Sequence, residues 1–239
     1  MDMRIYTKEN VSEEYINGLS DAPYLYCEDG VLSLRYRDMS LAGDYSEMQR
    51  RLKSANLRSE LLVKAAGLKN VEHPRVLDAT AGLGEDSLLL AAAGCEVDLY
   101  EYNPVIAALL ENTLERASHE ASLSGIVCHM HLHKADSIKA MGELKEVPDV
   151  IYLDPMFPER NKSGLIGKKF QILQKLEAPC MDADKLLGAA LRLKPKKIVI
   201  KRPLKGENLA GIKPAYSLKG KAVRYDCILP RQIAAPKVP

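Results

Sequence analysis

Five residues, Asp154-Pro155-Met156-Phe157-Pro158, follow an apolar run and combine a carboxylate with prolines and an aromatic ring. Proline has no N–H donor and restricts the chain, so the segment can present hydrogen-bond acceptors: the Asp154 carboxylate and a main-chain carbonyl. Such acceptors can orient the exocyclic amine of a base, on which Phe157 would stack. We predict that Asp154, Pro155 and Phe157 are catalytic. The structural alternative is a strand-ending Asp-Pro turn with a buried Phe.

A second stretch, residues 75–86, has an apolar run that ends in Asp78, then Gly82 and Gly84, then a helical pattern. Glycines let a ligand approach the backbone beside the free N–H groups of a helix. Both dinucleotides and S-adenosylmethionine bind at such loops. The dinucleotide fingerprint needs a third small residue where this chain has Ser87, so the spacing favours S-adenosylmethionine and the first motif of class I methyltransferases. A plain β-α turn is the structural alternative.

Strand and helix patterns alternate around these two stretches. Apolar, β-branched runs predict strands at residues 75–78, 95–101, 126–133, 149–154 and 197–201, with a closing strand, antiparallel in one alternative, at 222–229. Asn103 and Pro104 predict the start of a helix to about residue 121. This alternation predicts a doubly wound, mostly parallel α/β sheet with ligands beyond the carboxyl ends of its strands. Glu101, 23 residues after Asp78, is then suited to accept ribose hydroxyls.

The first 67 residues do not follow this alternation. Residues 1–45 predict a β appendage with a hairpin turn at Asp29-Gly30, and residues 46–67 a helical connector that Gly67 ends. The methyltransferase-like domain is expected over residues 68–230, and residues 231–239 as a flexible tail.

Composition indicates a cytoplasmic protein. The 239 residues include five cysteines and no Cys-x-x-Cys pair, which argues against a disulfide framework. We found no apolar run long enough to span a membrane and no signal-peptide pattern at the start. His129, His131 and His133 alternate along a predicted strand, but a polar strand face explains them better than a metal site, so we expect no metal.

Positive charge is concentrated in one part of the chain. Residues 160–224 contain 17 Lys or Arg and 4 Asp or Glu, although the whole chain has a net charge of only +2. A solvated surface is the simple explanation, but so large an excess favours a nucleic-acid partner. The candidates for RNA phosphate contacts are Arg58, Lys162, Lys168, Lys169, Lys201, Arg202, Lys219 and Lys221.

Four segments together resemble the bacterial small-subunit ribosomal RNA guanine-N2 methyltransferase J family. They are residues 78–84, residues 101–110, residues 152–158 and residues 199–203, within a match over about residues 67–226. The resemblance implies a class I, Rossmann-like fold and methyl transfer from S-adenosylmethionine to the N2 amine of a guanosine in 16S ribosomal RNA. It also implies the small ribosomal subunit as partner.

The same resemblance implies cofactor contacts. Beside Asp78, Gly82 and Gly84, these are Glu85, Asp86, Glu101, Tyr102, Asp136, Ser137 and Asp154. The family pattern has arginine where Glu85 stands, so a main-chain contact is expected at Glu85. The pattern also has a glycine-rich basic segment where this chain has residues 53–60. The alternatives are an amino-methyltransferase that acts on DNA or another RNA, and a non-catalytic nucleotide-binding or NAD-binding protein.

Overall fold

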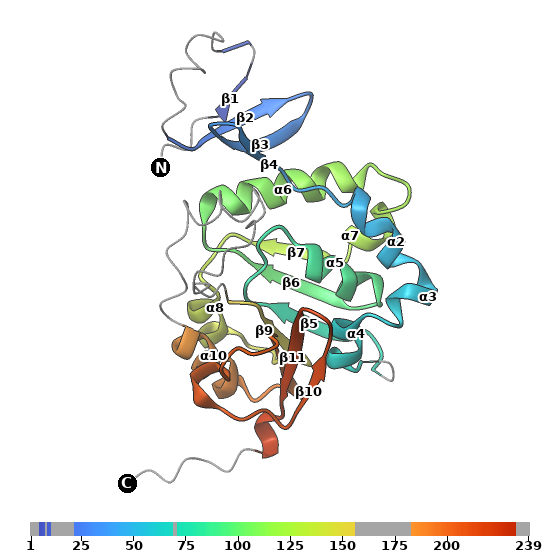
Figure 1. Cartoon of the computed structure of the whole chain (residues 1–239), viewed down its shortest axis with the longest axis vertical. Coiled ribbons are helices and arrows are strands. Elements are labelled where there is room, and N and C mark those ends of the chain that lie inside the picture. Colours follow the sequence, from blue (N-terminus) through green and yellow to red (C-terminus); the bar gives the residue numbers. More distant parts are fainter. Residues whose placement is uncertain (1–4, 8, 11–21, 69–70, 156–182, 233–239) are drawn as a thin grey trace.

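The computed structural model describes residues 5–7, 9–10, 22–68, 71–155 and 183–232 (Figure 1). Four residues predicted to act in the site or on RNA lie outside the described residues: Phe157, Lys162, Lys168 and Lys169.

A seven-stranded sheet forms the centre of the molecule, with strand order β10-β11-β9-β8-β5-β6-β7. Its strands are β5 (Arg75–Asp78), β6 (Glu96–Tyr100), β7 (Met130–His133), β8 (Val150–Leu153), β9 (Lys197–Pro203), β10 (Tyr216–Lys219) and β11 (Val223–Ile228). Strands β5 to β9 pair in parallel, whereas β11 and β10 are antiparallel to their neighbours. The predicted mostly parallel sheet and its antiparallel closing strand are confirmed; β10 was not predicted.

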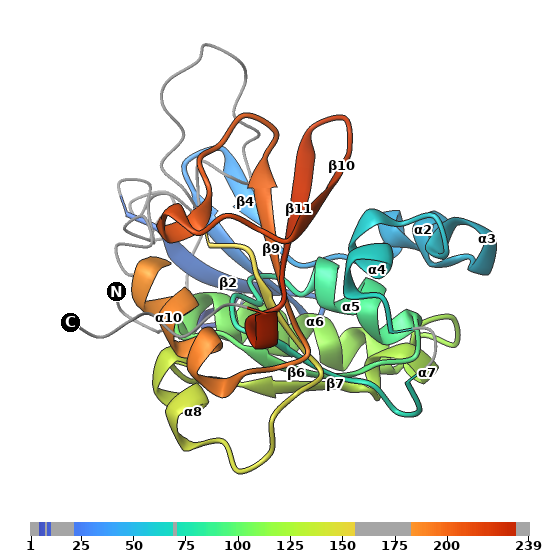
Figure 2. The same cartoon turned by 90° about the horizontal axis from the view of Figure 1, so that it is seen from below.

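Helices cover both faces of this sheet. They are α5 (Glu85–Ala92), α6 (Pro104–Ser118), α7 (Ser124–Val127), α8 (Ser137–Glu143) and α10 (Ala183–Leu193). Adjacent residues of a strand point to opposite faces, so Val76 packs in the cluster with Leu89 of α5, and Leu77 in the cluster with Leu187 of α10. Figure 2 shows α8 and α10 on one side and α4, α5 and α7 on the other. Burying each such leucine contributes about 1.5–3 kcal/mol.

One predicted strand begins later than expected. Residues 126–133 were predicted as a strand, but Ile126 and Val127 belong to α7 and β7 begins at Met130. Strand β6 begins at Glu96, and its Val97 pairs with Met130. The residues before Met130 therefore have almost no β6 backbone with which to pair. The prediction for 126–129 was therefore wrong.

The N-terminal region forms a separate sheet in the order β1-β2-β3-β4. Its strands are β1 (Ile5–Tyr6), β2 (Tyr24–Glu28), β3 (Val31–Tyr36) and β4 (Met39–Leu41). Asp29 and Gly30 have φ of 49° and 77°, as the tight turn predicted there requires. Leu34 of this sheet packs in one cluster with Val105 and Leu109 of α6, so the sheet lies on α6.

Short helices connect the two sheets: η1 (Ser46–Met48), α2 (Gln49–Leu52), α3 (Ser54–Leu57) and α4 (Leu61–Ala66). Gly67, with φ of 67°, ends α4 as predicted. The ammonium of Lys197 in β9 donates to the main-chain oxygens of Ala65 (2.8 Å) and Ala66 (3.0 Å). Two further short turns, η2 (Leu209–Gly211) and η3 (Pro230–Gln232), flank β10 and β11. Within the described residues, none of the helices has the length and apolar character to cross a bilayer.

Candidate active site

The sheet reverses its winding direction at β5, which lies between β8 and β6. In an open α/β sheet this point forms a crevice beyond the carboxyl ends of the strands. Asp78, Glu101, Asp136 and Asp154 follow or end the four parallel strands β5, β6, β7 and β8. The structure therefore brings these four predicted site residues to one edge of the sheet.

Asp78 is fixed inside the protein and has only 1% of its surface exposed. One carboxylate oxygen accepts a hydrogen bond from the main-chain N–H of Thr80 (3.0 Å), and the other from the Ser87 hydroxyl (2.6 Å). Burial raises the pKa of Asp78 to about 7, and these two hydrogen bonds oppose that rise. The buried Asp78 carboxylate therefore stabilises the conformation of the loop after β5.

The surroundings of the two glycines in this loop differ. Gly82 has φ of 56°, and a Cβ there would have no neighbour closer than the Thr80 oxygen at 4.0 Å. Gly84 has φ of 77°, and a Cβ there would lie 2.6 Å from the Tyr45 hydroxyl and 2.8 Å from Leu110 Cδ1. The side of Gly82 where a Cβ would stand is thus open, whereas Gly84 is required by the packing of Tyr45 and Leu110.

Glu101 fixes the other side of the same loop. One of its carboxylate oxygens accepts from the Gly82 N–H (3.0 Å) and the other from the Asn103 N–H (2.8 Å). Two main-chain donors hold the carboxylate in place. The neighbouring Tyr102 ring is 65% exposed, so a buried acceptor and an accessible flat ring lie together at the end of β6.

Asp136 and Ser137 lie at the start of α8, which follows β7. Asp136 accepts from the main-chain N–H of Ile138 (2.9 Å) and caps the helix, and Ser137 is buried. Since β7 neighbours β6 in the sheet, both residues lie on the Glu101 side of the crevice.

Thr80 links the loop after β5 to the loop after β8. Its hydroxyl accepts from the main-chain N–H of Asp154 (2.7 Å) and lies 3.4 Å from the Asp78 carboxylate. Sequence reasoning missed this residue. The signal was present in the sequence, because Thr80 stands two residues after Asp78. An Asp side chain commonly accepts a hydrogen bond from the main-chain N–H two residues later.

Lys201 of β9 forms a second link. Its ammonium lies 2.7 Å from an oxygen of Asp86 and 2.9 Å from an oxygen of Asp154. The same Asp86 oxygen accepts from the Tyr152 hydroxyl (2.6 Å). Burial lowers the pKa of Lys201, but the carboxylates of Asp86 and Asp154 outweigh it and raise that pKa above its ordinary value.

Two predictions change as a result. Lys201, predicted to contact RNA phosphate, is paired with carboxylates of the crevice. Tyr152 and Lys201 both bond to Oδ2 of Asp86, so we expect its main-chain N–H, in the first turn of α5, to contribute to the predicted cofactor contact.

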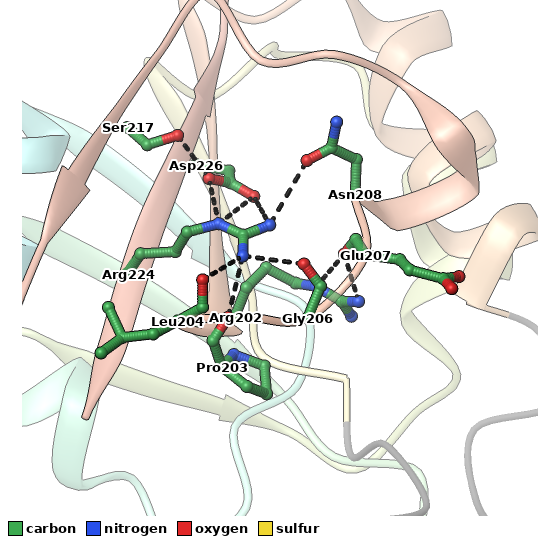
Figure 3. Close-up of polar contacts among 9 residues, drawn as sticks. All are labelled: Arg202, Pro203, Leu204, Gly206, Glu207, Asn208, Ser217, Arg224 and Asp226. Carbon is green, nitrogen blue, oxygen red and sulfur yellow. Dashed lines mark hydrogen bonds and ion pairs between the residues drawn. The ribbon is translucent and has the colours of Figure 1, made fainter.

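Arg202 was also predicted to contact RNA, but it is buried and donates to the Glu207 main-chain oxygen (2.9 Å). Its neighbour across the strands, Arg224, donates to the main-chain oxygens of Pro203, Leu204 and Gly206 and pairs with Asp226 (Figure 3). The prediction for Arg202 is corrected: these two arginines stabilise the loop after β9, so part of the basic excess is structural.

Three other RNA candidates are exposed: Arg58, Lys219 and Lys221. Lys219 pairs in register with Arg224, which pairs with Arg202 near the end of β9. The tip of the β10–β11 hairpin therefore lies at the carboxyl edge of the parallel strands. A Cβ on Gly220 would lie 2.8 Å from Leu61 Cδ1, so the tip touches the start of α4, three residues after Arg58.

The three histidines of the predicted strand bond to acidic residues of β6. His129 and His131 bond to Glu96 (2.6 and 2.9 Å), and His133 to Asp98 (2.8 Å). Within the described ranges, no group of three or more His, Cys, Asp or Glu is arranged to hold a metal ion.

The charge of the crevice discriminates between the two cofactors considered above. One lysine of the crevice, Lys201, stands against six acidic residues on its loops and helix starts: Asp78, Glu85, Asp86, Glu101, Asp136 and Asp154. A dinucleotide carries a negative pyrophosphate, which these groups would repel. S-adenosylmethionine carries a positive sulfonium and an ammonium group, so the residues present fit it.

Comparisons with known proteins agree with this fit. A family model described as "Putative SAM-dependent methyltransferase" matches residues 19–230. A solved SAM-dependent methyltransferase from Neisseria gonorrhoeae is 29% identical, with a TM-score of 0.75 over 96% of this chain and 97% of that one.

Two sequence relatives are each named ribosomal RNA small subunit methyltransferase J. The protein from Thioalkalivibrio sulfidiphilus is 46% identical over 72% of this chain and 68% of its own length. The protein from Stutzerimonas stutzeri is 45% identical over 74% of this chain and 69% of its own length. By sequence, fold and the chemistry of its crevice, the chain belongs to this family of S-adenosylmethionine-dependent methyltransferases.

Proposed function

We propose that the chain transfers a methyl group from S-adenosylmethionine to the N2 amine of a guanosine in 16S ribosomal RNA. The observation that carries the proposal is Asp154-Pro155 at the end of β8, held by Thr80 beside the Asp78–Gly82 loop. An acceptor for an amine and a loop for a methyl donor thus share one crevice. The names of the two relatives support ribosomal RNA as the substrate.

The cofactor is held on the β5 to β7 side of the crevice. Glu101 accepts the ribose hydroxyls, the open face of Gly82 lets the ligand approach the main chain, and Tyr102 packs on the base. Asp136 and Ser137, one strand further along, lie near the adenine, and Glu85 and Asp86 contribute main-chain groups. When bound, S-adenosylmethionine supplies an electrophilic methyl group.

The guanine amine is held on the β8 side. Its nitrogen is a weak nucleophile because its lone pair is delocalised, so orientation decides the rate. Asp154 accepts a hydrogen bond from the amine and stabilises the positive charge that develops on the nitrogen during attack. Taking the base out of its stack costs a few kcal/mol, which stacking on Phe157, outside the described residues, would offset.

RNA phosphates approach over the basic surface at the same edge of the sheet. We define this surface as Arg58, Lys219 and Lys221, to which the exposed Lys205 in the loop after β9 adds a cation that sequence reasoning missed. Lys205 and the hairpin tip with Lys219 and Lys221 lie at the carboxyl edge of β9, and β9 neighbours β8, the strand that Asp154 follows. Phosphate contacts give affinity and register without selecting a base.

The proposed substrate implies the small ribosomal subunit as partner and the cytoplasm as the site of action. The deciding experiment maps guanine-N2 methylation in 16S ribosomal RNA from cells that lack the protein and then restores it with purified protein and labelled S-adenosylmethionine. Loss of one N2-methylguanosine and its return in vitro are expected.

The in vitro arm compares naked 16S RNA, assembled small subunits, another RNA and DNA. Label that enters only DNA or an unrelated RNA would replace the proposed substrate with the second candidate. An unchanged methylation map would overturn the proposal.

A further inference from the structure

Lys201 joins two carboxylates that come from different elements of the crevice. Asp86 lies in the first turn of α5, Asp154 follows β8, and Lys201 lies within β9. The ammonium contacts both, at 2.7 and 2.9 Å, and its side chain is 27% exposed. Asp86 is fixed in turn by the Tyr152 hydroxyl at 2.6 Å. Lys201 is thus anchored on one carboxylate while it holds the other.

Asp154 is consequently constrained from two sides. Thr80 accepts its main-chain N–H, and Lys201 contacts its Oδ2. Oδ1 has no hydrogen-bond or ion-pair partner within the described part of the chain, and it is the oxygen that can accept from an amine. Burial raises the pKa of Asp154, and Lys201 is the principal group that opposes this rise.

The other charged and titratable groups around this pair do not replace the lysine. Asp86 raises the pKa of Asp154, and both of these carboxylates raise the pKa of Asp78; Tyr152 and Tyr225 have pKa values raised by burial, so both stay neutral. Arg202 adds a smaller positive contribution at Asp154.

We propose that Lys201 is a positioning residue for the methyl transfer: its ammonium, anchored on Asp86, keeps the Asp154 carboxylate ionised and oriented toward the substrate amine. This inference rests on the proposed function, in which Asp154 is the acceptor for that amine. A surface lysine that only binds phosphate would not need two carboxylate partners, and a purely structural ion pair would not need to include Asp154.

The first test compares Lys201→Met with Lys201→Arg. In the methionine variant we expect kcat to fall about 100-fold because the acceptor loses its orientation. The Kd for S-adenosylhomocysteine by calorimetry should stay within about threefold of the wild-type value. The acid limb of the pH profile of kcat should move to higher pH, and the arginine variant should recover much of the lost kcat.

Two partly buried carboxylates without a cation would repel each other and destabilise the fold, so the double variant Asp86→Asn, Lys201→Met is the control. It removes one carboxylate together with the lysine and should restore the melting temperature without restoring kcat. Recovery of kcat in this double variant would show that Lys201 only neutralises Asp86, and would overturn the inference.

A readout that needs neither substrate nor cofactor separates this inference from the proposed function. In protein labelled with carbon-13 at aspartate carboxyls, the Asp154 carboxyl should titrate at higher pH in Lys201→Met than in wild type or Lys201→Arg. An unchanged titration would overturn the role of Lys201 even if guanine methylation is confirmed. A shifted titration in a protein that methylates no guanine would contradict the proposed function and leave the control of Asp154 by Lys201 standing.

Discussion

The two halves of the crevice are held together in different ways. The donor half, which we define as Asp78, Gly82, Ser87 and Glu101, is joined by hydrogen bonds between residues at most 19 positions apart. The acceptor half, defined as Thr80, Asp86, Tyr152, Asp154 and Lys201, is joined by bonds across 66, 74 and 115 positions. The donor half is therefore a local motif, whereas the acceptor half exists only after three strands and α5 have assembled.

The halves also neutralise their carboxylates differently. Asp78 and Glu101 rely on main-chain N–H groups and a hydroxyl, whereas Asp86 and Asp154 share the ammonium of Lys201. Substitutions in the donor half should therefore change cofactor affinity or folding, and substitutions in the acceptor half should change turnover.

The largest effect is expected for Asp154→Asn. An amide keeps the size of the side chain but loses the negative charge that stabilises the amine during attack, so kcat should fall about 100- to 1,000-fold. Incorporation of labelled methyl into 16S RNA measures this loss. The affinity for S-adenosylhomocysteine should be nearly unchanged; if it falls as much as kcat does, the division into two halves is wrong.

Glu101→Gln should act in the opposite sense. Loss of a charged acceptor, worth about 1.5–3 kcal/mol, should weaken binding of S-adenosylhomocysteine roughly 10- to 100-fold. Turnover at saturating cofactor should change much less. The matched control is Glu96→Gln at the start of the same strand, where the carboxylate bonds to His129 and His131 and should not influence the cofactor.

The two glycines of the donor half separate packing from binding. Gly84→Ala brings a Cβ against Tyr45 and Leu110 at positive φ, so clash and strain together should lower the free energy of unfolding by about 2–5 kcal/mol. Gly82→Ala meets open space and should cost only the strain of positive φ, about 1–2 kcal/mol, while cofactor affinity falls. Denaturant titration and calorimetry check both; equal loss of affinity in the two variants would contradict the assignment.

Asp78 gives a pH-dependent contrast. Its pKa in the folded protein is raised to about 7 from an ordinary value of 3.8. Between these two pH values the folded state holds the Asp78 proton, whereas the unfolded state has released it. This group's contribution to the free energy of unfolding is therefore complete below about pH 4 and is lost as the pH rises through about 7. Unfolding of wild type and Asp78→Asn should show this loss only in wild type. A parallel pH dependence in both proteins would assign it to another group.

The smallest effect is expected at the basic surface. Replacing Lys219 and Lys221 with alanine should weaken RNA binding several-fold and reduce the log-log salt slope by about 1.4, or 0.7 for each lost phosphate contact. Lys145→Ala with Lys196→Ala, near the amino ends of β8 and β9, is the matched control. Equal changes in RNA affinity and salt slope in the two double variants would show that RNA binding depends on the overall positive charge and not on the basic surface defined above.

Predictions from sequence succeeded where the determining contacts are local. Asn103 caps α6 by accepting from Val105 and Ile106, and Asp29-Gly30 forms the hairpin turn, because both depend on neighbouring residues. The carboxylates at the strand ends were found because parallel strands end at one edge of the sheet.

Most of the errors concern residues whose partners lie far along the chain. Lys201 meets Asp86, 115 positions earlier, and nothing near Lys201 indicates this contact. Arg202 is the exception, because it bonds to Glu207 only five positions later, but no sequence signal shows that it turns inward. The role of Gly84 depends on Tyr45, 39 positions earlier, which no loop fingerprint includes. The start of β7 depends on where β6 begins, since a strand needs a partner.

The contact of Lys197 with Ala65 and Ala66 has a consequence for biosynthesis. Helix α4 has six residues, too few to be stable alone, and its carbonyls are bonded by a lysine 132 and 131 positions later. At about 5–20 residues per second, translation needs on the order of ten seconds to make that lysine. The connector therefore stays unfinished on the translating ribosome until β9 emerges. The acceptor half of the crevice, which includes Lys201 of the same strand, is completed at the same stage of synthesis.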